Sequence, residues 1–433
     1  MKRILSYIFL MIFVVAISLN SIGCGKVTNT QENKDDNTEP ITLKLMWWGN
    51  DQRKELTQKA IELFEQKHPN VKFETKTYLN TTDIKVNLAM NTADEEMPDI
   101  IQTNYDFVHN YALRDLFEPF NPYIEQNILN LSDVDKSYLE GGIDNNQLYG
   151  VPLGINAYCI AVNPLVFEKA GVEIPKSGYT YDELYEVAKN LKAQIKDDGF
   201  YPLANFVDFN TYVRSRESTY FNSKGTALGY EDDKIYVDYF KLQKKWIEEG
   251  LIAPDSLSDK NALITSGKSA IWWGVSNNVA VLSKTAKTVM KIISVPSYTK
   301  GKITSCVRPS MFFSVSSYSK HKKEAVEFIN FITNDLDVNN VLKGERGVPI
   351  SEKVSLSVEQ KLSEADKEQY LLMKYIKENP SSSDPPTPNT SGNVNYLFAR
   401  LSVQVLKGEI TPEESAKNFR IGANKILSGV KGE

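Results

Sequence analysis

The sequence predicts an α/β protein that is built of two lobes. The first observation is a strand–helix–strand–helix–strand order between residues 41 and 101, which indicates a parallel sheet with crossover helices. The second is length, because roughly 400 residues follow the N-terminal segment and one ordinary core does not hold so many. The third is an apolar run at 158–162, which we expect to carry the chain into a second lobe.

Residues 1–23 have the pattern of a secretory signal peptide. A positively charged start is followed by an apolar run over 4–19 and by small residues before Cys24. The run has about 16 residues, fewer than the roughly 20 that a membrane-spanning helix needs. Ser21 departs from the usual pattern, in which Leu precedes such a cysteine. We therefore expect lipidation of Cys24 after cleavage, with a simple secretory signal or an uncleaved anchor as the alternative.

A polar segment over 24–40 follows. It is rich in Asn, Asp, Thr, Gln, Glu and Lys, and it cannot bury enough apolar surface to fold. We expect it to be a flexible tether between the lipid and the body of the protein. An anchor of two or more acyl chains on Cys24 would hold it at the membrane, where a single chain binds only marginally.

The composition argues against nucleic acid and against metal ions as ligands. The net charge is −5, and loss of the signal peptide with its two basic residues makes the chain more acidic, whereas phosphate binding needs a basic face. The three histidines have no paired-ligand spacing, so we expect no metal and no cofactor. Cys159 and Cys306 allow one disulfide bond, but two cysteines in a chain of this size do not make a disulfide scaffold.

The elements of the first lobe follow from hydrophobic periodicity. Apolar residues alternate in the strands and recur every three or four positions in the helices, and Asn50 or Asp51 can cap the first helix. The expected order is a strand at 41–48, a helix at 51–67, a strand at 71–78, a helix at 82–91 and a strand at 97–101. Ligands of parallel sheets bind outside the carboxyl ends of the strands, which singles out residues 47–51 and 102–107.

The second lobe is expected to mix helices and short strands. A strand at 311–315 should return to the first lobe, and residues 380–392 should form a loop between late helices. The other expected elements are helices at 180–193, 232–249, 259–267, 321–333 and 411–427, and strands at 270–273 and 292–296.

Residues 262–269 match a relaxed phosphate-loop pattern. Such a loop must follow a strand and open a helix, whereas here a helix ends at Gly267 and a strand begins at Ala270. Glycine after a helix is an ordinary C-cap. We therefore expect no nucleotide site and, because no catalytic segment is recognisable, no enzyme.

Several segments in order resemble the extracellular solute-binding proteins of family 1, which serve carbohydrate importers of the ABC type. None is specific alone, but together they span nearly the whole mature chain. The segments are Trp47-Trp48-Gly49 with the helix ending at His68-Pro69-Asn70; Met97-Pro98-Asp99-Ile100 with 113–119; Tyr149-Gly150-Val151-Pro152 with 161–171; 267–271; Arg346-Gly347-Val348-Pro349; and 408–427.

The resemblance implies a two-lobed periplasmic-binding-protein fold, type II-like, with a ligand cleft between the lobes and crossing hinge segments. It places lobe 1 at 41–153 plus about 305–345, and lobe 2 at 154–304 plus about 346–433. It implies a monomer that closes on a mono- or oligosaccharide, delivers it to the permease subunits of an importer and meets the membrane through acylated Cys24. The alternatives are another solute, such as a peptide, polyamine or anion, and a surface carbohydrate-active enzyme.

A sugar site needs aromatic plates for C–H faces and polar groups for hydroxyls. Each tryptophan pair ends a strand, so one member should be core and the other should face the cleft; we favour Trp48 over Trp47 and Trp273 over Trp272. The polar and remaining aromatic candidates are Asp51, Asn104, Asp106, Asn156, Tyr158, Asn277, Arg308 and Tyr396. Asp51 and Asp106 have a helix cap as their alternative role, and Asn156 has a backbone partner as its alternative.

Overall fold

The computed structural model describes residues 39–429 except 255, 256, 258, 382, 383, 386 and 389. The predicted signal peptide, Cys24 and nearly all of the predicted tether lie outside the described residues, and so does the side chain of Asp106. From Pro40 onward the chain forms one compact unit.

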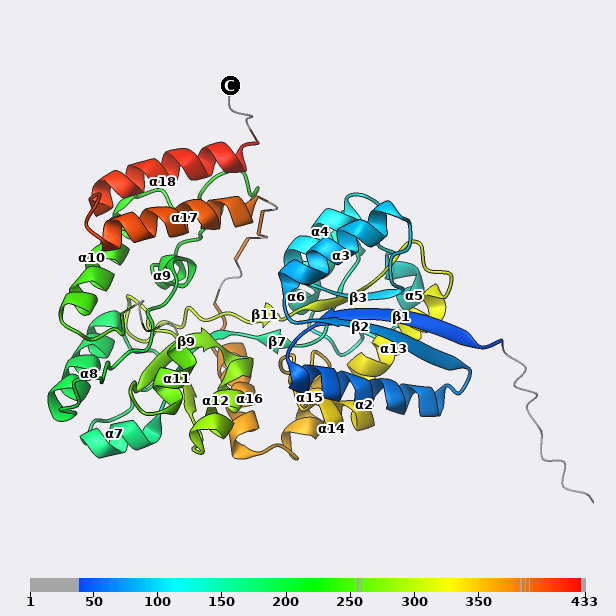
Figure 1. The fold of residues 1–433 in the computed structure, drawn as a ribbon, viewed down its shortest axis with the longest axis horizontal. Helices are drawn as coiled ribbons and strands as arrows, with labels where there is room; N and C mark the ends of the chain where they lie inside the picture. The colour runs from blue at the N-terminus through cyan, green and yellow to red at the C-terminus, as the bar shows by residue number, and fades with distance from the viewer. Residues whose placement is uncertain are drawn as a thin grey trace, which may run out of the picture. The chain divides into compact units, whose positions relative to one another are not determined.

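The first sheet has five strands in the order β2-β1-β3-β12-β6. β1 runs parallel to β2 and to β3, whereas β12 is antiparallel to both β3 and β6. The predicted parallel sheet and the return of the later strand to it are confirmed (Figure 1). The strands are β1 (Ile41–Trp48), β2 (Val71–Tyr78), β3 (Ile100–Thr103), β6 (Val151–Pro152) and β12 (Phe312–Val315).

Alternation along β1 sends its side chains to two different cores. Leu45 and Trp47 pack with α2 (Asp51–Lys67) and α13 (Lys322–Asn334). Met46 packs with α3 (Thr81–Ala93) and α4 (Tyr105–Ala112) on the other face, and Trp48 lies against that second cluster. Figure 1 shows these two helix pairs on opposite sides of the sheet. The side chain of Asn50 caps α2 by accepting from the Arg53 amide.

The second sheet has three antiparallel strands in the order β10-β8-β9. Its core is rich in aromatic side chains, among which Trp246, Tyr236 and Phe240 are fully buried. The strands are β8 (Tyr158–Val162), β9 (Ile271–Val275) and β10 (Lys291–Ile293). The helices around it are α7 (Pro164–Ala170), α8 (Tyr181–Gln194), α9 (Phe209–Ser215), α10 (Lys234–Glu248), α11 (Lys260–Thr265), α12 (Val279–Ala286), α16 (Glu364–Glu378), α17 (Ser391–Leu406) and α18 (Pro412–Leu427).

Short elements complete the chain. They are α5 (Asn121–Glu125), α6 (Lys136–Leu139), η1 (Glu140–Gly142), β4 (Ile143–Asp144), β5 (Gln147–Leu148), η2 (Ser276–Asn278), α14 (Leu336–Leu342) and α15 (Glu352–Glu359). The order at Gly267 is as predicted from the sequence, because α11 ends before it and β9 follows it, so the segment lacks the strand–loop–helix order of a phosphate loop.

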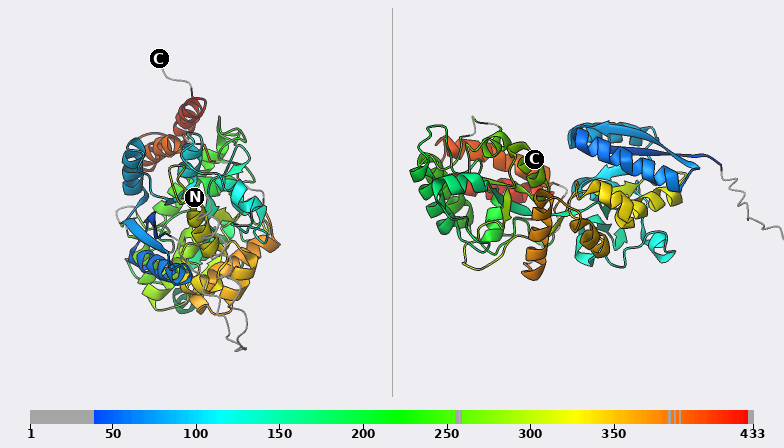
Figure 2. Two further views of the ribbon diagram at one scale, coloured as in Figure 1. Left: turned by 90° about the vertical axis from the view of Figure 1, so that its right-hand side faces the viewer. Right: turned by 90° about the horizontal axis from the view of Figure 1, so that it is seen from below.

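Two short strands join the lobes (Figures 1 and 2). β7 (Ile155–Asn156) pairs antiparallel with β11 (Arg308–Pro309), and Ile155 also exchanges backbone hydrogen bonds of 2.8 and 2.9 Å with Val348. Gly347 has φ +123°, and a Cβ there would lie 2.7 Å from both the Ile155 carbonyl oxygen and Asn156 Oδ1. Only glycine lets these segments approach so closely.

The predicted residue bounds of the two lobes remain a prediction. Ser351 donates a 2.7 Å hydrogen bond to Asp133, which ties the start of α15 to the segment before α6. α16, by contrast, packs against α12 and β10 of the second sheet.

Asp99 ties the first sheet to the turn after β12. Its buried carboxylate accepts from the Lys44 amide of β1 at 2.7 Å and from the Ser319 hydroxyl at 2.5 Å. A buried carboxylate is tolerated only when such partners satisfy it.

We predict that Asp99→Ala lowers the free energy of unfolding by about 2–4 kcal/mol, because two buried donors lose their acceptor. Urea denaturation followed by circular dichroism measures this loss. Asp94→Ala, at an exposed position after α3, is the control and should change stability by less than about 0.5 kcal/mol. Equal effects of the two substitutions would contradict the assigned role.

Candidate ligand-binding cleft

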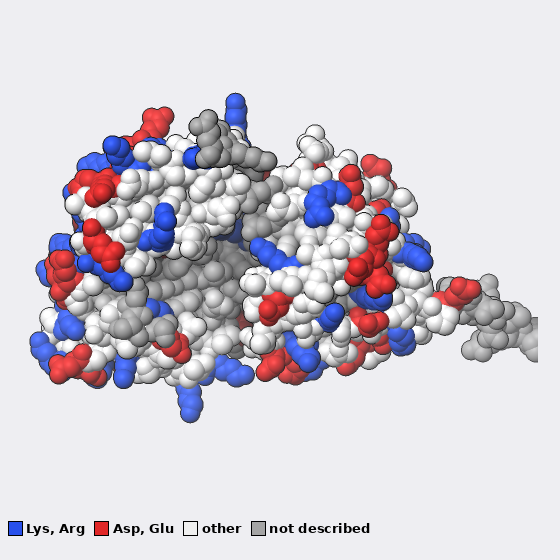
Figure 3. Space-filling view, turned by 45° about the horizontal axis from the view of Figure 1, so that its top comes forward, with Lys and Arg blue, Asp and Glu red and all other residues white. Residues whose placement is uncertain are grey.

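A cavity of about 300 Å³ lies where the crossing segments meet the two lobes. This volume is at the lower end of the range for small-molecule sites. Figure 3 shows a hollow between the lobes, with Lys and Arg side chains in and around it. The lining residues used below are Asn104, Tyr105 and Glu140 from the first lobe, Asn156, Tyr158, Arg308 and Ser310 from the crossing region, and Asp384 and Thr387 from the loop before α17.

An aromatic stack stands at this cavity. The rings of Tyr158 and Trp273 are stacked with centroids 5.1 Å apart and an interplanar angle of 26°. The guanidinium carbon of Arg308 lies 5.0 Å from the centroid of the Tyr158 ring, within cation–π distance. Asn205 holds the backbone of Trp273 at both its N–H and its C=O, which keeps this strand end in place.

Several buried polar atoms around the cavity lack a hydrogen-bond partner in the part of the chain that the structure covers. Asn156 Oδ1 and Ser310 Oγ belong to cavity-lining residues. A small pocket continues past Arg308, and three of its residues carry further such atoms, which are Asn210 Oδ1, Thr211 Oγ1 and Thr304 Oγ1. An unsatisfied buried polar group is costly, so atoms that gather in one place indicate a polar ligand that satisfies them.

Charged groups surround the same pocket. Arg214 forms an ion pair with Asp384 and donates to the Thr304 carbonyl oxygen at 3.1 Å. Asp208 caps α9 by accepting from the Thr211 amide at 2.7 Å, and burial raises the pKa of its carboxyl group. Burial also raises the pKa of the Cys306 thiol, and Cys306 and Cys159 are both free thiols, so the disulfide bond that the sequence allows is not formed.

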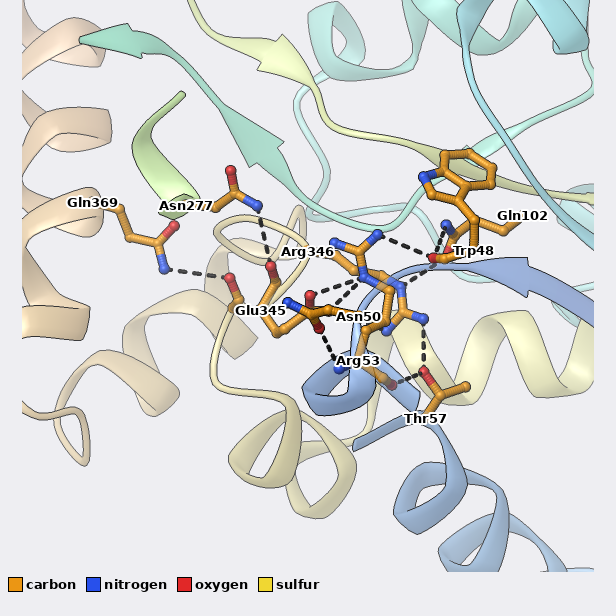
Figure 4. Close-up of polar contacts among 10 residues, drawn as sticks. Trp48, Asn50, Arg53, Thr57, Gln102, Asn277, Glu345, Arg346 and Gln369 are labelled. Atoms are coloured by element: carbon orange, nitrogen blue, oxygen red, sulfur yellow. Dashed lines mark hydrogen bonds and ion pairs between the residues drawn. The ribbon is translucent and has the colours of Figure 1, made fainter. Parts of the chain in front are cut away.

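A larger groove of about 860 Å³ lies near the first turn of α2, α12, α14 and α16. Asn277 is one of its lining residues and donates to the Glu345 carbonyl oxygen at 3.2 Å. Buried Gln369 donates to the Gly344 carbonyl oxygen at 3.3 Å. Asn277, just after β9, and Gln369, on α16, therefore hold the turn at 344–345 (Figure 4).

The same turn is tied to the first lobe through charged groups (Figure 4). Arg53 binds both carboxylate oxygens of Glu345 at 2.9 and 3.1 Å and donates to the Trp48 carbonyl oxygen at 3.2 Å. Buried Arg346 donates to Gln102 at 3.0 Å and to Thr57 at 2.7 Å. Burial lowers the pKa of Arg346 to about 9, against the opposing effect of Glu345. The Nε–H of Arg53 is shared between the two oxygens of Glu345, and such charge-assisted hydrogen bonds are stronger than neutral ones.

The structure brings four of the predicted site residues to one cavity, and these are Asn104, Asn156, Tyr158 and Arg308. Trp273 joins them through its stack on Tyr158, and it is half-buried whereas Trp272 is only 6% exposed. Asn104 also serves as the cap of α4. Their role as ligand contacts remains a prediction.

The other predicted residues do not line this cavity. Trp48 is half-buried beside Phe107, whereas Trp47 is only 1% exposed. Trp47 is therefore the core member of this pair. Asp51 is the exposed first residue of α2, and Tyr396 on α17 is 74% exposed. Asn277 lines the larger groove instead, and the Asp106 side chain lies outside what the structure describes.

Sequence reasoning missed Glu140, Ser310 and Asp384 at the cavity, and Arg214 beside it, whereas Tyr105 lies within the predicted segment 102–107. Ser310 directly precedes the predicted strand at 311–315, so extending that segment by one position would have included it. Asp384 sits in a loop without periodicity and pairs with a residue 170 positions away, so nothing in the sequence pointed to it.

Two features are not found among the described residues. Among the described residues, no group of three or more His, Cys, Asp or Glu is placed to hold a metal ion. No helix in the described range is both long and apolar enough to cross a membrane.

Comparison with known proteins agrees with this geometry. Residues 49–335 match the family model of the bacterial extracellular solute-binding proteins. A carbohydrate ABC transporter substrate-binding protein of Streptococcus pneumoniae serotype 4 is 25% identical over 384 residues, which are 80% of this chain and 73% of that protein.

Solved structures share the fold. A family 1 extracellular solute-binding protein from Alicyclobacillus acidocaldarius superposes with a TM-score of 0.71 and 23% identity over 91% of this chain and 100% of that one. A periplasmic oligogalacturonide-binding protein from Yersinia enterocolitica, solved with saturated digalacturonic acid, gives a TM-score of 0.74 and 22% identity over 89% and 98% of the two chains.

The fold and the interlobe cavity define a binding protein of the two-lobed type. The chain belongs to the bacterial extracellular solute-binding protein family, whose members serve ABC transporters. The two-lobed α/β fold predicted from the sequence is thereby confirmed.

We predict that Cys306 reacts with a thiol reagent in the native protein and that Cys159 does not, because Cys306 is half-buried at the cavity and Cys159 is 0% exposed. The measurement is alkylation followed by peptide mass spectrometry in a Cys24→Ser background. Labelling should speed up with pH because the thiolate is the reactive form. Equal labelling of both thiols under native conditions would contradict the cavity geometry.

Proposed function

We propose that this protein captures a sugar or oligosaccharide by closure of its two lobes and delivers it to the membrane permease of an ABC importer. The observation that carries the proposal is the cavity at the crossing segments, where Tyr158, which stacks on Trp273, lies with Asn156 Oδ1 and Ser310 Oγ, two buried polar atoms without a partner among the described residues. Sugars offer hydroxyl edges and C–H faces, which polar atoms and aromatic rings match.

The named relatives support a carbohydrate as the ligand class. The pneumococcal relative is named as a carbohydrate-binding component, and solved neighbours of the same fold carry digalacturonic acid or tagatose. A shared fold does not itself define a ligand. The proposal of a carbohydrate ligand therefore depends on the residues at the cavity.

Closure follows from contacts on both sides of the cavity. A ligand that touches Asn104 or Tyr105 of the first lobe and Asp384 or Thr387 near the second favours the conformation in which these groups are close. The importer would then read the closed form. We propose binding without catalysis, in keeping with the solute-binding family to which the chain belongs.

We further propose that acylated Cys24 anchors a monomer at the outer side of the cell membrane and that the segment up to residue 40 acts as its tether. Support comes from the sequence pattern before Cys24. An anchored binder stays near its permease, which raises its effective concentration there.

A thermal-shift screen tests the ligand class. We expect at least one mono- or oligosaccharide, at 100 times its dissociation constant, to raise the free energy of unfolding by about 2.7 kcal/mol. A shift by a peptide or polyamine and by no sugar would reject the carbohydrate proposal. Hydrolysis of a chromogenic glycoside that one carboxylate substitution abolishes would favour an enzyme instead.

The same proposal predicts opposite outcomes for the two adjacent tryptophans in β9, which makes them a matched pair. Trp273→Ala should weaken sugar binding by a few kcal/mol while the fold survives, because the half-buried ring stacks on Tyr158, which lines the cavity. Trp272→Ala should cost about 3–5 kcal/mol of stability, because its ring is core. Calorimetric binding and urea unfolding of both variants measure this, and unfolding caused by Trp273→Ala would place that ring in the core.

The anchor has its own test. Cells fed a labelled fatty acid should yield labelled wild-type protein in the membrane fraction, whereas Cys24→Ser should be unlabelled and released. Cys159→Ser serves as the control for loss of a thiol and should leave the labelling unchanged. Retention of the label in Cys24→Ser would place the lipid elsewhere.

A further inference from the structure

Arg308 is a basic residue that lines the cavity. It lies in β11 directly opposite Asn156 of β7, and it borders both the cavity and the small pocket that continues from it. Its guanidinium is held against the ring of Tyr158, which itself stacks on Trp273. The position of its charge is therefore set by backbone pairing and by ring packing.

Within the described ranges, Arg308 forms no ion pair with a carboxylate. Asp384 is paired with Arg214, and Asp208 is engaged as the cap of α9. Glu140 lines the cavity from an exposed position at the end of α6. The neighbouring acids are thus committed to other partners or lie near solvent.

Removal of a guanidinium from water is unfavourable, and for Arg308 the Tyr158 ring and the charges of Asp384 and Asp208 offset this cost without an ion pair. A planar carboxylate, by contrast, matches the fork of an arginine with two parallel hydrogen bonds.

Arg308 needs a hydrogen-bond acceptor, whereas the polar atoms of two residues near it can accept hydrogen bonds from a donor. Asn156 Oδ1 accepts only, and it is unpartnered in a residue 6% exposed. Ser310 Oγ, also unpartnered, both donates and accepts. A ligand that fits all three therefore carries an anionic acceptor together with hydroxyl donors on the same small frame.

We infer that the natural ligand is an acidic sugar of the uronate type, whose carboxylate binds Arg308 while neighbouring hydroxyls bind Asn156 and Ser310. This inference rests on the proposed function and narrows its substrate class. On this inference, Arg308 gives the site its preference for acidic over neutral sugars.

Titration calorimetry of the full chain in detergent tests it with matched probes. The acidic probes are galacturonate, digalacturonate and glucuronate; the neutral probes are the methyl esters of the same compounds together with galactose and glucose. Glucose 6-phosphate is a third arm. We expect at least one uronate to bind about tenfold or more tightly than its own methyl ester, because esterification removes the charge and leaves the hydroxyls in place.

Substitutions test whether Arg308 causes the preference for the acid over its ester. Arg308→Gln should weaken uronate binding about 100-fold, as for truncation of one partner of a buried charge pair, and should change binding of the ester much less. Arg400→Gln, an exposed arginine on α17, is the control for net charge and should leave both affinities unchanged. If Arg308→Gln fails to fold, Arg308→Lys and the acid–ester comparison on the wild type still decide the question.

Each remaining outcome has a defined meaning. Binding of neutral sugars alone, equal binding of a uronate and its ester, or an unchanged preference in Arg308→Gln overturns this inference and leaves the proposed function standing. Tighter binding of glucose 6-phosphate than of every uronate overturns the carboxylate assignment. Absence of binding by any sugar overturns the inference and the proposed function together.

Discussion

Backbone pairing between the crossing segments is the constraint on which the rest of the site depends. β7 is hydrogen-bonded to β11 on one side and to Val348 on the other, and Gly347 makes the second approach possible. This pairing sets Asn156 directly opposite Arg308, and Tyr158 follows two residues later at the start of the second sheet. Main-chain hydrogen bonds thus set the positions of these cavity-lining residues, and side-chain packing sets the orientation of their side chains.

A second set of contacts holds the turn at 344–346 from both lobes. Arg53 and Arg346 connect it to the carboxyl ends of β1 and β3, through the Trp48 carbonyl and Gln102, and Asn277 reaches it from the end of β9. Charged groups buried in this way are favourable only with complete sets of partners. The strand ends at which a parallel sheet binds its ligands are therefore joined to the crossing region by one network.

The cavity itself contrasts with this network, because several of its buried polar atoms have no partner in the part of the chain that the structure describes. Those unpartnered atoms lower the stability of the folded protein, and a ligand that supplies the missing hydrogen bonds restores it. The charged groups Arg53, Glu345 and Arg346 of the network have partners, whereas several polar atoms at the cavity have none among the described residues, and this difference favours the cavity as the binding site. It also explains why a list of polar residues, taken from the sequence without their partners, does not identify the site.

The sequence by itself determined the local elements, since periodicity and capping depend on neighbouring residues; the helix at 51–67 and the strand at 71–78 match their predicted bounds. It also indicated that one tryptophan of each pair is core, because alternation holds in any strand. Only the tertiary structure decided which one, since α2 and α13 cover the face of Trp47. The pairing of Arg214 with Asp384 and the free state of Cys159 and Cys306 depend on contacts between distant parts of the chain, and no local pattern records those.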